Sequence, residues 1–98
     1  VTLSCGLQIL KQAGNLRVEG FIDPDQPVSG SYLLAVERSG RSGTSIVNQG
    51  WAFSTDGRDL ELLGQVILNA QPREIVGELT LNWDGGQQVC RNITLRDL

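Results

Sequence analysis

Apolar and polar residues alternate along most of the chain, which is the pattern of β-strands that bury one face and expose the other. Each alternating run is short and ends at glycine, proline, asparagine or aspartate. The apolar sets that share one face are Leu3, Cys5, Leu7 and Ile9; Leu16, Val18, Gly20 and Ile22; Tyr32, Leu34 and Val36; Leu60, Leu62, Gly64, Val66 and Leu68; and Ile75, Gly77, Leu79, Leu81 and Trp83. A polar but β-capable stretch covers residues 44–53, and a last strand is expected from about Gln87 to Leu95.

Turn residues separate these runs. The predicted turns and loops are Gly14-Asn15, residues 23–27 with two prolines, residues 39–43, Asp56-Gly57 and Asp84-Gly85-Gly86. The last is expected to be a type I′ hairpin turn with positive φ at both central positions. About seven short strands with regular turns predict an all-β, immunoglobulin-like sandwich of antiparallel strands, and 98 residues suit a single domain spanning 1–98.

One segment also fits a helix. Leu60, Leu63, Gly64 and Ile67 have the i, i+3, i+4, i+7 spacing of an amphipathic helix. A glycine in mid-segment and the β-branched pair Val66-Ile67 disfavour that alternative, so we expect a strand.

The two cysteines lie near opposite ends of the sequence. In an exported protein Cys5 and Cys90 would form a disulfide, and in a cytosolic one they would be two unrelated buried thiols. The absence of methionine, even at Val1, suggests a removed leader, so we favour the disulfide and a periplasmic location. In the chain-entropy estimate such a long loop contributes about 4.5 kcal/mol.

The phase of the last strand is irregular. Cys90 shares its phase with the polar Gln88 and Asn92, whereas Val89, Ile93 and Leu95 have core character. A β-bulge near Cys90, or a disulfide at the sheet edge, would account for this.

Composition excludes most chemistry. Without histidine, neither a Ser-His-Asp triad nor a His metal site can form, and two cysteines cannot make a Cys₄ zinc site. The aspartates of residues 23–25 and 56–59 read better as turn caps than as calcium ligands. We therefore expect no enzyme activity, no catalytic residue, no cofactor and no metal. A net charge of −3 argues against nucleic-acid binding, and no apolar run is long enough for membrane insertion.

Two stretches that carry positive charge contain no acidic residues. These are residues 1–18 and 38–55, and the second also contains Trp51 and Phe53. We take Arg17, Arg38 and Arg41 as candidate client-binding residues, because guanidinium groups bind carboxylates and stack on aromatic rings. An ordinary solvated surface is the alternative. Trp83 has its own simpler interpretation as a core residue.

Several short motifs together resemble a known family. They are Cys5, Gly30-Ser31-Tyr32, Ser42-Gly43, Gln49-Gly50-Trp51-Ala52-Phe53, Leu63-Gly64, and Asp84-Gly85 followed by Cys90. Their order and spacing over nearly the whole chain resemble the curli assembly chaperones and inhibitors, the CsgC/CsgH-like family, and within it the alphaproteobacterial CsgH-type branch. One departure is that enterobacterial relatives carry a Cys-x-Cys pair, which this chain lacks, so a redox role is unsupported.

The resemblance implies a function as well as a fold. It implies an immunoglobulin-like sandwich that acts in the periplasm, without ATP and below one equivalent, to prevent premature amyloid nucleation of a curli-type fibre subunit. Amyloid grows by adding strands to exposed edges, so a monomer whose own edges are guarded by Arg, Glu, Gly and Pro could touch a client edge without templating it. The alternative is a structural or adhesive immunoglobulin-like module of an exported surface protein.

Overall fold

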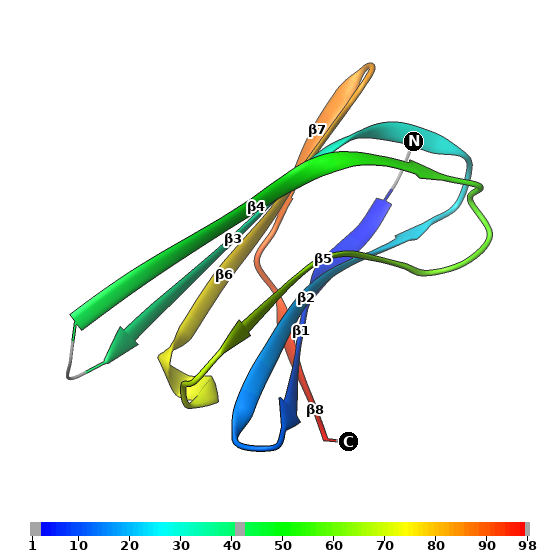
Figure 1. Cartoon of the computed structure of the whole chain (residues 1–98). Helices are drawn as coiled ribbons and strands as arrows, with labels where there is room; N and C mark the ends of the chain where they lie inside the picture. The colour runs from blue at the N-terminus through cyan, green and yellow to red at the C-terminus, as the bar shows by residue number, and fades with distance from the viewer. Residues whose placement is uncertain (1–2, 41–42, 98) are drawn as a thin grey trace.

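The described part of the chain folds into eight strands and one short 3₁₀ helix. The computed structural model describes residues 3–40 and 43–97. The elements are β1 (Leu3–Gln12), β2 (Asn15–Pro24), β3 (Val28–Gly40), β4 (Gly43–Thr55), β5 (Glu61–Leu68), η1 (Pro72–Glu74), β6 (Ile75–Trp83), β7 (Gly86–Cys90) and β8 (Ile93–Asp97) (Figure 1). No helix in this part of the chain is long and apolar enough to span a membrane.

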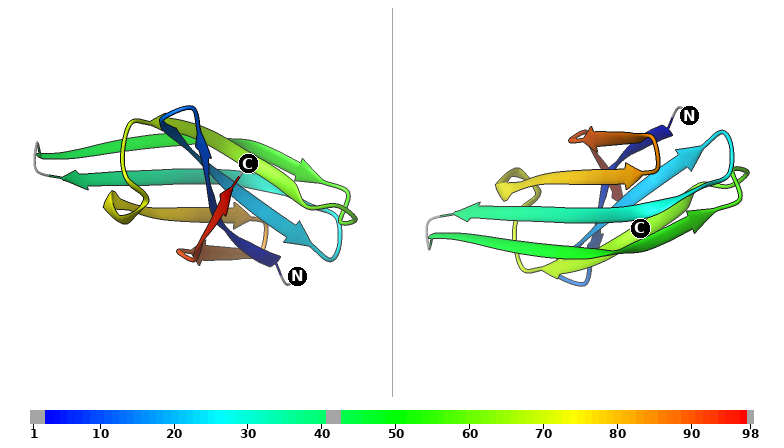
Figure 2. Two further views of the ribbon diagram at one scale, coloured as in Figure 1. Left: turned by 90° about the horizontal axis from the view of Figure 1, so that it is seen from below. Right: turned by 90° about the horizontal axis from the view of Figure 1, so that it is seen from above.

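The strands form two four-stranded sheets that pack as a sandwich. The first sheet has the order β5-β2-β1-β8 and the second β4-β3-β6-β7 (Figures 1 and 2). All neighbours are antiparallel except β1 and β8, which run parallel with Leu7 beside Ile93. The predicted β-sandwich is confirmed, with eight strands in place of about seven and one parallel pair among antiparallel ones.

The core consists of the inward-facing apolar residues of both sheets. Those that are almost completely buried are Leu7, Ile9, Val18, Ile22, Leu34, Val36, Leu79 and Leu81. All of them belong to the alternating sets read from the sequence, because a strand of period two presents every second side chain to the opposing sheet. Trp83 is partly buried against this core, as its simpler interpretation predicted.

The segment expected to be one last strand is two strands in different sheets. β7 ends at Cys90 and pairs with β6, and after Arg91-Asn92 the chain crosses to pair with β1 as β8. Of the two explanations for the irregular phase, the disulfide at the sheet edge is correct, because β7 is the last strand of its sheet. The assignment of Val89, Ile93 and Leu95 to the core was wrong, because these residues are 38%, 37% and 51% exposed. Cys90 is buried within β7, whereas Ile93 follows the phase of Leu7 in the other sheet.

β5 is a strand, as expected, but its phase changes in the middle. Glu19 lies opposite Gln65 and Gly20 opposite Leu63, so Gly64 is left over as a β-bulge with φ of 78°. Leu63 is therefore buried, and Leu62 is 51% exposed. The assignment of Leu60 and Leu62 to the core phase was wrong, because alternation read through a bulge places every residue on one side of it on the wrong face.

Two hairpin turns differ in detail from expectation. The β1–β2 turn has positive φ at Ala13 (48°) and Gly14 (85°), the type I′ combination, one residue earlier than predicted. At the β6–β7 turn Gly85 has φ of 97° but Asp84 does not have positive φ. This turn is therefore not type I′, and that prediction was wrong.

The β3–β4 hairpin is longer than the rest of its sheet. Each strand has 13 residues, and the pair reaches beyond β6 and β7 (Figure 2). Along β4 every residue from Gly43 to Ala52 is exposed, and burial begins only at Phe53. β4 therefore presents both of its faces from Gly43 to Ala52, whereas Leu34 and Val36 on β3 are buried in the core.

Candidate interaction surfaces

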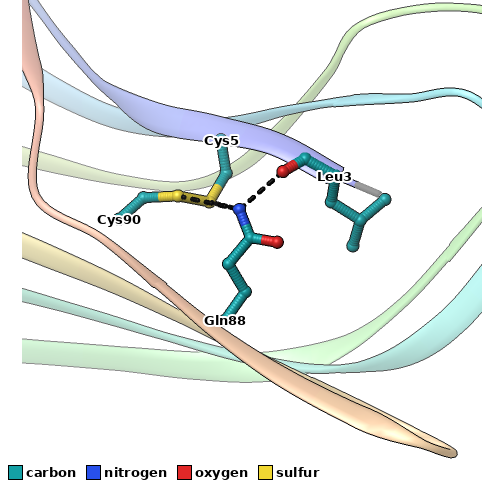
Figure 3. Close-up of a disulfide and its surroundings, with 4 residues drawn as sticks. All are labelled: Leu3, Cys5, Gln88 and Cys90. Atoms are coloured by element: carbon teal, nitrogen blue, oxygen red, sulfur yellow. Dashed lines mark hydrogen bonds between the residues drawn. A yellow bond between two sulfur atoms is a disulfide. The ribbon is translucent and has the colours of Figure 1, made fainter. Parts of the chain in front are cut away.

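The cysteines form the expected disulfide. Cys5 on β1 and Cys90 on β7 are bonded across the two sheets, 85 residues apart in sequence and 5.8 Å apart between Cα atoms (Figure 3). Both are buried, and Gln88 lies against the bond: its Nε2 donates to the carbonyl oxygen of Leu3 and lies 3.6 Å from each sulfur. The bond and this amide join the start of β1 to β7, which is a structural role.

Arg17 lies on the outer face of the first sheet. Its Nε is 3.7 Å from a carboxylate oxygen of Glu19, which is only 6% exposed and also accepts a hydrogen bond of 3.0 Å from Gln8. The nearest cross-strand neighbours of the outward Leu10 are Arg17 on β2 and Arg96 on β8, and Leu10 is 7% exposed. The side chains of Arg17 and Arg96 flank this apolar side chain. The Nε of Arg17 is buried and has no hydrogen-bond partner among the described residues, whereas Arg96 is exposed.

Arg38 lies on the second sheet, on the face that is directed toward the first sheet. On β3 it has the phase of Leu34 and Val36, and its direct neighbours are Ile75 on β6 and Ser45 on β4. It is half-buried, and its Nε is enclosed without a hydrogen-bond partner among the described residues. Arg41 lies outside the described residues. Arg17 and Arg38 are thus not neighbours on one sheet face.

What these arginines share is one end of the sandwich. The β1–β2 turn, η1, the end of β3 and the end of β8 lie toward the same end in Figure 1, and the β2–β3, β4–β5 and β6–β7 connections lie toward the opposite one. The first end holds the basic residues Lys11, Arg17, Arg38, Arg73 and Arg96, with Glu37, Glu74 and Asp97. The opposite end holds the acidic residues Asp23, Asp25, Asp56, Asp59, Glu61 and Asp84, with Arg58. The small net charge therefore conceals a polarised distribution, which sequence order alone does not show.

Asp56 caps a turn as expected. Oδ1 of Asp56 accepts a hydrogen bond of 2.9 Å from the backbone N–H of Arg58, and the buried Thr55 hydroxyl accepts one of 3.1 Å from Gly57. In residues 3–40 and 43–97 no three acidic or cysteine side chains gather in a way that could hold a metal ion.

An open hollow of about 460 Å³ lies where β4 passes β5. Its lining includes Tyr32, Trp51 and Leu62, and Glu19 lies at its base. Trp51 is 77% exposed, while its sequence neighbour Phe53 is 7% exposed and belongs to the core. Of the two aromatic residues singled out in the sequence, only Trp51 is available for contact.

Gln49 holds the two sheets together at this hollow. Its side-chain oxygen accepts a hydrogen bond of 2.6 Å from the backbone N–H of Gln65, next to the bulge in β5. A Cβ on Gly64 would lie 2.6 Å from that same oxygen, so the glycine is required for the approach. The sequence named Gln49 only as part of the motif at residues 49–53 and predicted no contact for it, but a glycine inside a strand pattern is a signal for a bulge.

These features define the class of protein. The chain is a small β-sandwich with a disulfide between its sheets, and it offers open surfaces and strand edges to a partner. The sequence model of the CsgH protein family matches residues 4–92, so the chain belongs to the CsgH family. No curated protein sequence matches it significantly.

Two solved structures have the same fold. The solution structure of R. palustris CsgH aligns with a TM-score of 0.79 and 24% identity, covering 91% of this chain and 89% of that one. The E. coli curli protein CsgC aligns with a TM-score of 0.72 and 17% identity, covering 93% and 96%. The resemblance to the CsgC/CsgH-like family is thereby confirmed.

Proposed function

We propose that this protein is a periplasmic chaperone that inhibits premature amyloid nucleation of a curli-type fibre subunit, without ATP and without enzymatic chemistry. Membership of the CsgH family over residues 4–92 is the observation that carries the proposal, since it supports a curli-associated role. The disulfide suits an oxidising compartment such as the periplasm. Both sheets are complete and cross-linked, which favours a self-contained chaperone over a fibre module awaiting a donated strand.

The polarised charge supports a charge-guided encounter. The basic end would attract acidic segments of a client and orient the approach, and contacts of this kind are weak enough to permit release. Arg17 and Arg38 remain our candidate client contacts, together with Arg41, which lies three residues after Arg38 in the sequence. Because the Debye length falls from about 10 Å at 0.1 M salt to about 3 Å at 1 M, inhibition should weaken as salt rises.

Dye-monitored fibrillation of a purified curli-type subunit tests the function directly. With this protein well below one equivalent, we expect a much longer lag. An unchanged lag at equal stoichiometry would overturn the chaperone proposal and return attention to a structural or adhesive module.

Paired charge variants then test the basic end. Arg17→Gln with Arg38→Gln removes two positive charges there, and Arg58→Gln with Arg91→Gln removes two elsewhere, which makes it the matched control. We expect the first pair to shorten the lag extension and the control to leave it unchanged. If both pairs have the same effect, only net charge matters and the proposed end is wrong.

A further inference from the structure

The four edge strands of the sandwich are protected very differently. β7 and β8 have five residues each, and β8 carries Arg96 and Asp97. β5 is interrupted by its bulge at Gly64 and covered there by the side chain of Gln49. Short length, charge, bulges and covering side chains are the usual ways in which proteins prevent strands from adding to an edge.

β4 has none of these protections over its first half. It pairs with β3 alone among the described strands, it has 13 residues, and it contains no Lys, Arg, Asp, Glu or Pro. From Gln49 onward it passes close to β5, but Gly43–Asn48 lies beyond that contact and every residue in it is exposed. The expectation that all edges of this sandwich are guarded therefore fails at β4.

The register shows which backbone groups of β4 are unpaired. In the β6–β7 hairpin, Trp83 and Gly86 flank a two-residue turn and form a hydrogen-bonded pair, so the N–H and C=O of Trp83 point toward β7. Backbone groups of successive residues in a strand point in opposite directions, so those of Thr80 and Asn82, like every second residue of β6, point toward β3. The alternation continues without a shift across β3 into β4. The N–H and C=O groups of Thr44, Ile46 and Asn48 consequently point away from β3, toward the free edge.

The same alternation of backbone hydrogen-bonding directions can be checked elsewhere in the molecule. In the β1–β2 hairpin the closing pair is Gln12 and Asn15, which directs the N–H of Gln65 on β5 away from β2. That N–H is the one that Gln49 accepts, and Leu7 donates toward β8, to the carbonyl oxygen of Asn92 at 2.9 Å. Both bonds agree with the rule.

We propose that the free edge of β4, residues 43–48, captures an extended, uncharged strand of the amyloid-forming subunit by β-strand addition. The inference rests on the proposed function and names the contact that performs it. The segment Gly-Thr-Ser-Ile-Val-Asn itself has the length, β-propensity and lack of charge of segments that stack in cross-β fibres, so the strand that matches it best is one of that kind. Charge at the basic end guides the encounter, and the backbone groups at the free edge of β4 form hydrogen bonds with the captured strand.

The geometry also explains why capture would not propagate. A strand added to β4 has this protein on one side, and the far edge of the same sheet is the five-residue β7. No continuous fibre-like edge therefore runs through the sandwich. A nucleus whose growing strand is bound in this way lacks the edge to which the next identical strand would add.

A pair of proline variants tests the proposal. Proline removes a backbone N–H and is tolerated on edge strands where that N–H faces solvent. Asn48→Pro removes an N–H that points to the free edge of β4, and Gln87→Pro removes the equivalent N–H at the edge of β7. We expect the protein concentration that doubles the fibrillation lag to rise about tenfold for Asn48→Pro, the equivalent of one or two hydrogen bonds, and to stay unchanged for Gln87→Pro.

Each outcome has a defined meaning. If the wild type does not extend the lag, the proposed function fails. If the wild type and Asn48→Pro inhibit equally, or both proline variants lose inhibition, the edge inference is overturned while the function stands. If sedimentation shows a wild-type dimer that Asn48→Pro makes monomeric, the edge pairs with a second copy, which also overturns it.

A measurement on the unaltered protein keeps the test independent of whether the variants fold. Amide hydrogen exchange of the wild type should slow at Thr44, Ile46 and Asn48 when the subunit is present, and stay constant at Gln87 and Val89. Unchanged exchange at the three β4 amides in an inhibiting sample would refute strand addition there.

Discussion

Removing the disulfide should cost a large part of the stability of this protein. The bond connects residues 85 positions apart, and the Cα separation of 5.8 Å lies in the usual range for disulfides. Because Cys5 and Cys90 lie near the two ends of the sequence, the bond closes a loop that contains almost the whole chain. The chain-entropy relation gives about 4.5 kcal/mol for such a loop, against a total of about 5–15 kcal/mol for a typical domain.

Two perturbations separate the cross-link from the packing of its sulfurs. Reduction of the wild type keeps both buried sulfur atoms, whereas Cys5→Ala with Cys90→Ala removes them and leaves small cavities. We expect reduction to lower the free energy of unfolding by about 4 kcal/mol, and the double variant to lose slightly more. For a chain of this size the corresponding fall in Tm is about 20–35 °C.

Urea unfolding followed by tryptophan fluorescence measures both effects. The oxidised wild type, the reduced wild type and the double variant are compared at one temperature, and the reducing agent must leave the double variant unchanged. A loss of less than about 1 kcal/mol on reduction would refute the loop-closure argument. It would mean either that the unfolded chain is already restricted or that the bond strains the folded state.

Three further predictions concern single side chains. Gly64→Ala should lower the free energy of unfolding by about 2–3 kcal/mol, because the residue has φ of 78° and a Cβ there would lie 2.6–3.2 Å from neighbouring atoms. The control Gly14→Ala has φ of 85° and open space around the Cβ, so it should cost only about 1 kcal/mol. Equal losses in urea unfolding would contradict the role of the bulge. Leu34→Ala should lower the free energy of unfolding by about 2–5 kcal/mol and the adjacent Leu33→Ala by about 1 kcal/mol or less, because Leu34 is 0% and Leu33 45% exposed. Similar losses for the two variants would mean that the faces of β3 are assigned wrongly. Trp51→Ala should leave the free energy of unfolding within about 0.5 kcal/mol of the wild type, because the indole is 77% exposed; a larger loss by the same assay would show that the ring supports the fold.

The sequence by itself predicted most of the strands, most of the core and the only pairing that two cysteines allow within one chain. Period-two alternation is a local property, so residues such as Leu7, Leu34 and Leu79 could be assigned to buried faces before their partners were known. The cysteine pairing needed no geometry beyond the presence of two cysteines.

Only the tertiary structure decided where that local pattern stops applying. The bulge at Gly64 reversed the faces of β5, and the crossing after Cys90 divided one expected strand between two sheets. In both places burial depends on which strand lies opposite, and a single strand carries no record of its partner.

The candidate surfaces were likewise set by assembly. The sequence grouped Arg17 with Arg38, but pairing put them on different sheets and gave them only a common end of the molecule. The sequence marked residues 44–53 as β-capable. The free edge at Gly43–Asn48 was visible only in the structure, where β3 is longer than β6 and β4 pairs with no other described strand. Whether a strand's outer hydrogen-bonding groups are satisfied is a property of the whole sheet, and for this protein it is the property on which the proposed contact depends.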